Sequence, residues 1–252
     1  MNIPVTKGTL ARLAAFSMFG FAVATIIPAY NDYSASTINI SVVVVYAAVI
    51  SVILAQAANR RSKLLDSVRV ELNKLRRLYH ISKNLSAGSP ERFRGWFTEL
   101  HGHLYGYLTF FSGKDFGAYD DSNAGFRKLS YHVYTIPDIE SRKEQALFDD
   151  ILRTTAAIAE ARQQIKELWD NRLSAYTWTS LFLLTASFVV TTAFAAGDTT
   201  GARTAAGAAF AVALLVLDLL WEVDTLASER SIIAGRYVSN LAKLELKRED
   251  VK

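Results

Sequence analysis

Two carboxylates at the end of an apolar run are the strongest candidates for chemistry in this sequence. In LLVLDLLWEVD (residues 214–224), Asp218 lies within the run and Glu222 one helical turn further along. A charged side chain at the centre of a bilayer costs roughly 2.5–3.5 kcal/mol on insertion scales, so it should face a partner or water. One interpretation is a ring of carboxylates at the cytoplasmic mouth of a pore, which would favour cations. The alternatives are that Asp218 pairs with an arginine or caps a cytoplasmic helix, and that Glu222 lies at the membrane interface. Asp224 lies off their shared face, and we expect it to be solvated.

A second candidate is a stripe of small and polar side chains along the apolar segment 38–58. On a helix, one face of this segment carries Ser41, Val44, Ala48, Ser51, Ala55 and Asn59. Such a face could line a water-filled path as a set of pore-lining residues. It could equally allow close packing of a neighbouring helix, as small residues do in membrane proteins. From the residues alone we favour packing.

No other pattern indicates a catalytic, metal or cofactor site. The chain has no cysteine, which excludes disulfides, thiolate nucleophiles and Cys-ligated metals. Of the four histidines, His101 and His103 are two residues apart and would point to different faces of a helix. No phosphate-binding glycine loop, nucleophile elbow or HExxH motif is present. We therefore predict no enzymatic activity, no metal and no cofactor. The net charge of +4 is too mild to predict a nucleic-acid partner.

Four apolar segments of about 20 residues dominate the two ends of the chain. They cover residues 10–29, 38–58, 176–196 and 204–221, and each is close to the length that crosses a bilayer. A secretory signal at the first segment is a poor fit, because its apolar core is long and the second segment follows closely. We predict an all-α integral membrane protein with four transmembrane helices, arranged as two hairpins that flank a helical cytoplasmic domain.

The predicted domains follow from these segments and from the distribution of charge. They are an N-terminal transmembrane hairpin at 1–58, a cytoplasmic helical domain at 59–174, a C-terminal transmembrane hairpin at 175–224 and a cytoplasmic helix or tail at 225–252. The loop 31–37 contains no Lys or Arg and the loop 197–203 contains only Arg203, whereas the other segment ends are rich in both. This bias predicts that both termini and the middle region lie in the cytoplasm.

The middle region is predicted to be helical throughout, with the second span continuing into it as one long helix. Ser89 and Pro90 indicate a helix start, with a capping side chain and a proline at the first position. Ser141 and Glu144 match the capping-box spacing at another start. A row of glycines follows the first of these starts, at Gly95, Gly102, Gly106 and Gly113. We expect a neighbouring helix close to this row, and the alternative is a frayed helix of low stability.

The second half of the chain resembles the bestrophin-like family of bacterial four-span membrane proteins. The resemblance lies in a helix start at 143–148 (KEQALF), in Arg162, in Leu173 with Trp178 at the entry to the third span, and in the pair Leu217 and Asp218. Leu219 and Leu220 replace the Pro-Phe that the family tends to have after this pair. Bestrophins are pentameric anion channels, so the resemblance implies a homo-oligomer in a bacterial inner membrane, a pentamer by analogy, with the second span lining the pore.

Two classes of function fit these observations. The first is an oligomeric bestrophin-like ion channel with a cytoplasmic helical vestibule. The second is a non-conducting membrane scaffold or accessory subunit that binds a protein partner through its cytoplasmic helices, for which the aromatic-rich region 96–116 is a candidate. An ion-coupled transporter that uses Asp218 is a third interpretation, although four spans are few for one and neither hairpin contains an obviously broken helix.

Overall fold

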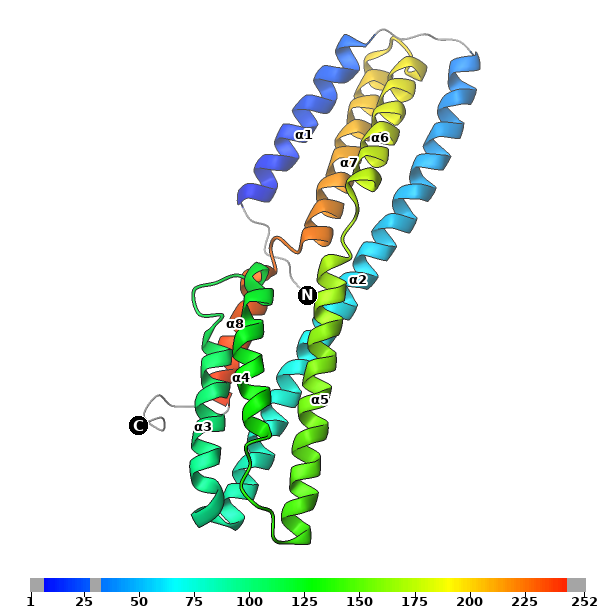
Figure 1. The fold of residues 1–252 in the computed structure, drawn as a ribbon. Helices are drawn as coiled ribbons and strands as arrows, with labels where there is room; N and C mark the ends of the chain where they lie inside the picture. Colours follow the sequence, from blue (N-terminus) through cyan, green and yellow to red (C-terminus); the bar gives the residue numbers. More distant parts are fainter. Residues whose placement is uncertain (1–6, 28–32, 244–252) are drawn as a thin grey trace. The chain divides into compact units, whose positions relative to one another are not determined.

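The computed structural model describes residues 7–27 and 33–243, and this part of the chain is helical without strands (Figure 1). The elements are α1 (Lys7–Ile26), α2 (Tyr33–Gly88), α3 (Pro90–Thr109), the 3-10 helix η1 (Phe116–Ser122), α4 (Asn123–Val133), α5 (Arg142–Asp170), α6 (Ala175–Ala195), α7 (Thr200–Thr225) and α8 (Arg230–Lys243). The all-α prediction is confirmed for these residues, as is the continuation of the second span into one long helix, α2.

The chain divides into two compact units. The first, here called the apolar unit, consists of residues 1–59 and 172–225, and the second unit consists of residues 60–171 and 226–252. Helix α2 contributes to both units, since its first half belongs to the apolar unit and its second half to the second unit.

Three helical stretches among the described residues are long and apolar enough to cross a membrane. They lie within Thr37–Gly88, Ala175–Ala195 and Thr200–Leu241. A shorter apolar stretch, Ala14–Ile26, lies in α1. Three of the four predicted spans are therefore found, while the end of the predicted first span, at residues 28–29, lies outside the described residues.

In the apolar unit, α1 packs along α7 through two glycines (Figure 1). A Cβ atom added at Gly20 would lie 2.6 Å from the carbonyl oxygen of Gly207, and one added at Gly207 would lie 3.3 Å from the Cα of Phe21. Atoms this close leave no room for a side chain, so the two backbones are in direct contact.

Arg203 satisfies the C-terminal end of α1. Its Nη1 donates to the carbonyl oxygens of Ala24 and Ile27, at 2.7 and 2.6 Å, and its Nη2 donates to Asp198 at 2.8 Å. The last carbonyls of a helix lack intrahelical donors, and a cation near them also interacts favourably with the helix dipole. This contact accounts for the single arginine of the loop 197–203, which the charge distribution assigned to the outer side.

Helices α6 and α2 complete the apolar unit, in the order α1, α7, α6, α2. Helix α6 packs against α7. Helix α2 contacts α6 through a stacked pair, Tyr46 and Phe188, with ring centroids 4.6 Å apart, and through a hydrogen bond of 3.0 Å from Thr192 to Asn39. Helix α2 therefore lies at one edge of this row.

A buried carboxylate is the centre of the second unit. Glu71 on α2 has no exposed surface, and it accepts hydrogen bonds from the hydroxyls of Tyr107 on α3, Tyr119 on η1 (2.8 Å) and Tyr237 on α8 (2.6 Å). Arg162 on α5 lies 3.3 Å from the same carboxylate. Five elements thus meet at one charge, and its pairing offsets the high cost of burying it.

The partners of Glu71 are themselves satisfied. Arg162 also donates to Ser122 Oγ at 3.0 Å and to Asn123 Oδ1 at 2.7 Å, and its guanidinium stacks within about 5 Å of the rings of Tyr107 and Tyr119. Burial, and next the adjacent Glu71 charge, hold the pKa of each of the three tyrosines well above the ordinary value. These hydroxyls therefore stay protonated and remain donors.

An apolar core surrounds this cluster, and the aromatic-rich region 96–116 is part of it. Four of its aromatic side chains are buried there, namely Trp96, Tyr107, Phe111 and Phe116. The core also takes in the apolar residues of α2 and α5, including Leu64, Val68, Leu75, Ile151, Ile158 and Ile165. Packing in this core explains why region 96–116 is rich in aromatic residues. From the sequence, the same region was a candidate surface for a protein partner.

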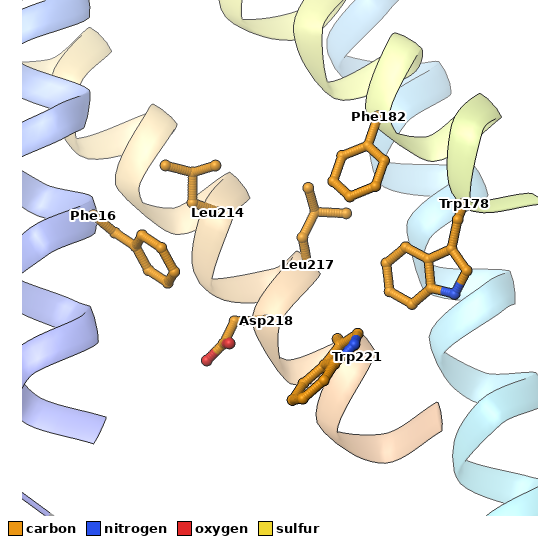
Figure 2. A pocket seen from close by; sticks show the side chains of 7 residues that line it. All are labelled: Phe16, Trp178, Phe182, Leu214, Leu217, Asp218 and Trp221. Carbon is orange, nitrogen blue, oxygen red and sulfur yellow. The ribbon is translucent and has the colours of Figure 1, made fainter. Parts of the chain in front are cut away.

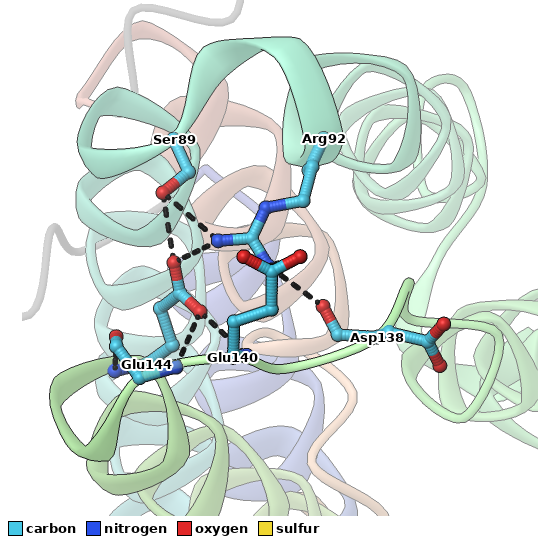
Figure 3. Close-up of polar contacts among 6 residues, drawn as sticks. Ser89, Arg92, Asp138, Glu140 and Glu144 are labelled. Atoms are coloured by element: carbon cyan, nitrogen blue, oxygen red, sulfur yellow. Dashed lines mark hydrogen bonds and ion pairs between the residues drawn. The ribbon is translucent and has the colours of Figure 1, made fainter.

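Glu144 ties the start of α5 to the start of α3 (Figure 3). The predicted capping box is confirmed, with Ser141 Oγ accepting from the Glu144 backbone and the Glu144 carboxylate accepting from the Ser141 backbone. The carboxylate also accepts from Ser89 Oγ at 2.8 Å and Arg92 Nη2 at 2.5 Å. Ser89 does begin α3, but its hydroxyl bonds Glu144 in place of a backbone N–H of its own helix.

The expected neighbour of the glycine row is not found within the described chain. A Cβ atom added at Gly95, Gly102 or Gly106 would meet no atom within 4 Å. The face of α3 opposite its buried side chains carries these residues, so they point away from the core. Gly113 ends the row in a turn at φ 76°, a conformation that favours glycine.

Removing a partner of Glu71 should lower the free energy of unfolding of the second unit far more than removing an exposed ion pair does. We expect Arg162→Met to lower the free energy of unfolding by roughly 3–5 kcal/mol, because it leaves Glu71 buried without its cation. The matched control is Arg69→Met, which removes the exposed pair with Asp66 and should cost about 1 kcal/mol or less. Chemical denaturation in detergent, followed by circular dichroism, measures both, and equal losses would contradict this account.

The Glu144 contacts predict a loss of stability in acid. Hydrogen bonding from Ser89, and next from the Glu140 backbone, lowers the pKa of Glu144 from 4.5 to about 2. Because the folded pKa lies below the unfolded one, the stabilisation is complete above pH 4.5 and is lost as the pH falls towards 2. We expect the free energy of unfolding to fall less between about pH 6 and pH 3 in Glu144→Gln than in the wild type. The same fall in both proteins would refute this assignment.

Candidate functional site

The stripe predicted on the second span lies on the open side of α2. Its six residues, Ser41, Val44, Ala48, Ser51, Ala55 and Asn59, are all exposed in the chain. The buried residues of the same segment, Tyr46, Ile50 and Ala57, lie on the opposite side of the helix. Packing against another helix of the same described chain therefore does not account for the stripe, although we favoured packing from the sequence.

The two serine hydroxyls of the stripe are satisfied locally. Ser41 Oγ donates to the carbonyl oxygen of Thr37 at 3.2 Å, and Ser51 Oγ donates to that of Ala47 at 2.6 Å. Hydroxyls bonded in this way can sit in an apolar setting and can still accept a hydrogen bond from water. Only 11% of the most apolar 18-residue stretch of α2 is buried, whereas 39% of the corresponding stretch within Thr200–Leu241 is buried. Of the three candidate spans, α2 thus has the most surface available to water, lipid or another copy.

Asp218 is paired with an arginine. From the sequence, this pairing was one of two alternatives to a ring of carboxylates. Arg12 Nη1 on α1 lies 3.1 and 3.2 Å from the two carboxylate oxygens of Asp218 on α7. The side chain of Asp218 is 26% exposed and that of Arg12 is 51% exposed. Among the contacts described for this part of the chain, none joins Asp218 to α2, so the carboxylate and the stripe are separate features of the apolar unit.

A cavity of about 500 Å³ lies beside Asp218 (Figure 2). Its walls come from three helices, with Phe16 on α1, Trp178 and Phe182 on α6, and Leu214, Leu217, Asp218 and Trp221 on α7. Figure 2 shows the α1 and α6 aromatic side chains on either side of the α7 residues. Sequence reasoning missed this cavity, because its aromatic residues come from helices far apart in the chain and no spacing rule connects them.

The other two carboxylates near the end of α7 have different surroundings. Glu222 is half-buried and makes no hydrogen bond or ion pair with the described residues. Asp224 is only 3% exposed, and its Oδ1 accepts a hydrogen bond of 3.1 Å from the backbone N–H of Leu173. The expectation that Asp224 is solvated was therefore wrong. The carboxylate is buried because it holds the segment that leads into α6 against the end of α7.

The histidines lie in the second unit, and two of them are buried. His132 and Trp96 form reciprocal contacts, in which Trp96 Nε1 donates to the carbonyl oxygen of His132 at 3.0 Å and His132 Nε2 lies 2.8 Å from that of Trp96. His101 packs against the rings of Tyr79 and Phe97. Within residues 7–27 and 33–243, no group of three or more His, Cys, Asp or Glu side chains could hold a metal ion.

Comparison with known proteins identifies the family. The family model described as "Bestrophin-like domain" matches residues 10–223, a range that takes in most of both units and all four predicted spans. No curated protein and no solved structure matched the chain. The three apolar helices fit a membrane protein, as the resemblance of the second half predicted. The chain belongs to the bestrophin-like domain family.

Proposed function

We propose that the protein is an oligomeric ion channel in which identical copies place the stripe of α2 around a central, water-filled path. The observation that supports this most directly is the exposure of all six stripe residues on the side of α2 that faces away from α6. A closed ring of identical subunits brings the same face of each copy to one axis. Membership of the bestrophin-like domain family supports the same arrangement, by analogy with the channels.

The proposal includes four spans, with α1 as the fourth. Helix α1 has 20 residues, which corresponds to about 30 Å at 1.5 Å per residue. It packs along α7, and Asp218 neutralises its Arg12, which lowers the cost of placing that charge in a bilayer. The distribution of Lys and Arg then orients both termini and the second unit towards the cytoplasm of a bacterial inner membrane, where the second unit would form the vestibule.

The stripe itself carries no charge, so the proposed path is lined by hydroxyl, amide and small side chains. Asp218 is left out of this lining, because it pairs with Arg12 at the α1–α7 contact. The proposal therefore contains no ring of Asp218 carboxylates. It also contains no catalytic residue, cofactor or nucleic-acid partner, and its partners are the bilayer and further copies of the chain.

The alternative is a non-conducting scaffold or accessory subunit, and the glycine row on α3 favours it. Glycine in a helix costs roughly 1 kcal/mol relative to alanine, and three glycines of this row face open space in the described chain. A helix of a protein partner could approach them closely. A channel and a scaffold differ in one property that can be measured, which is whether water reaches the stripe of α2.

The absence of cysteine from the sequence makes this test direct, because single cysteines can be added without a background. In proteoliposomes, we expect Ala48→Cys and Ser51→Cys to react with a membrane-impermeant thiol reagent at least about tenfold faster than Val43→Cys and Val45→Cys, since the bilayer core contains no water. The two valines are matched controls, because they are also exposed in the chain but lie on either side of the stripe. Equal rates at all four positions would contradict the channel.

A further inference from the structure

We propose that the cavity beside Asp218 is a binding site for an amphiphilic organic cation, meaning a quaternary ammonium or protonated amine that carries hydrocarbon groups. The volume of about 500 Å³ falls in the range that small-molecule sites have in proteins. The site belongs to α1, α6 and α7 and does not include the α2 stripe, so the proposal does not rest on the channel.

The chemistry of the walls selects a cation. Four aromatic rings, two leucines and a single carboxylate line the cavity. Aromatic faces attract ammonium groups, and cages of such rings recognise quaternary ammonium ligands. An anion would meet both the Asp218 charge and the negative ring faces.

Arg12 is the internal competitor for this site. It reaches Asp218 through one nitrogen, Nη1, its side chain is half exposed, and it is not part of the cavity wall. A carboxylate has about four acceptor positions, so Asp218 can meet a second cation or exchange one for the other. The pair with Arg12 keeps the Asp218 charge compensated while the cavity is empty.

The occupant is an amphiphilic cation and not a lipid headgroup. The ammonium of a zwitterionic headgroup is tethered to a phosphate, which would enter a wall made of rings, leucines and one carboxylate. The ring faces are negative and the leucines offer no hydrogen bond, so the cavity wall does not favour a phosphate. A free ammonium with hydrocarbon substituents brings no such charge into the cavity.

The test measures the affinity of the full-length protein for tetrabutylammonium by isothermal titration calorimetry, in micelles of the neutral detergent dodecyl maltoside. We expect saturable binding at one site per chain. Asp218→Asn should weaken it by about tenfold or more and Trp178→Leu should weaken it several-fold, whereas Arg12→Gln should tighten it because the competing guanidinium is gone.

Two control variants make the result specific. Asp198→Asn also removes a carboxylate paired with an arginine, Arg203, but at an exposed position away from the cavity. Ser51→Val alters the α2 stripe, where a pore-blocking cation would bind. Both should leave the affinity for tetrabutylammonium unchanged.

Three outcomes would overturn the proposal. Equal affinities of Asp218→Asn and Asp198→Asn would show that the carboxylate is not a ligand. Weaker binding by Arg12→Gln would show that Arg12 does not compete. Loss of binding when phosphatidylethanolamine is added to the micelles would show that the site holds a lipid ammonium. If Asp218→Asn fails to fold, Arg12→Gln and Trp178→Leu still decide, because neither removes the carboxylate.

Discussion

Glu71 carries a negative charge into the centre of the second unit, and the neighbouring elements are arranged around it. Three tyrosine hydroxyls and one guanidinium reach the carboxylate from α3, η1, α8 and α5. A buried charge without such partners would be strongly destabilising, so each of these elements has one allowed register relative to α2. Apolar packing alone tolerates many side-chain exchanges, whereas this set of contacts specifies one arrangement.

The apolar unit follows a different rule, because little apolar surface can be gained by packing helices that already lie in lipid. Its contacts are a glycine crossing between α1 and α7, a cation at the carbonyl end of α1, and one ion pair between the same two helices. These contacts pair the charges of Arg12, Asp218 and Arg203. They leave two features without a partner in the described chain, the small and polar face of α2 and the aromatic cavity beside Asp218.

Features within one helix could be predicted from the sequence, and features between helices could not. The apolar windows, the long α2 and the capping box at Ser141 follow from spacing along the chain, since helix geometry fixes which residues share a face. The partner of Asp218 is 206 positions away, and the hydroxyls around Glu71 come from three separate elements. No pattern of spacing encodes such contacts. Asp224 was misjudged for the same reason, because its burial depends on the segment leading into α6. The glycine row on α3 is the opposite case. Its spacing predicted a neighbouring helix, and no such neighbour is present in the described chain.

In the proposed channel, several copies of the chain enclose a path lined by α2. The most direct measurement is single-particle imaging of the purified protein in lipid nanodiscs, which gives both the number of subunits and the position of each α2. The account predicts a closed ring in which Ala48 and Ser51 of every copy face a water-filled axis. A monomer, an open assembly, or a ring whose α2 helices face the surrounding lipid would contradict it.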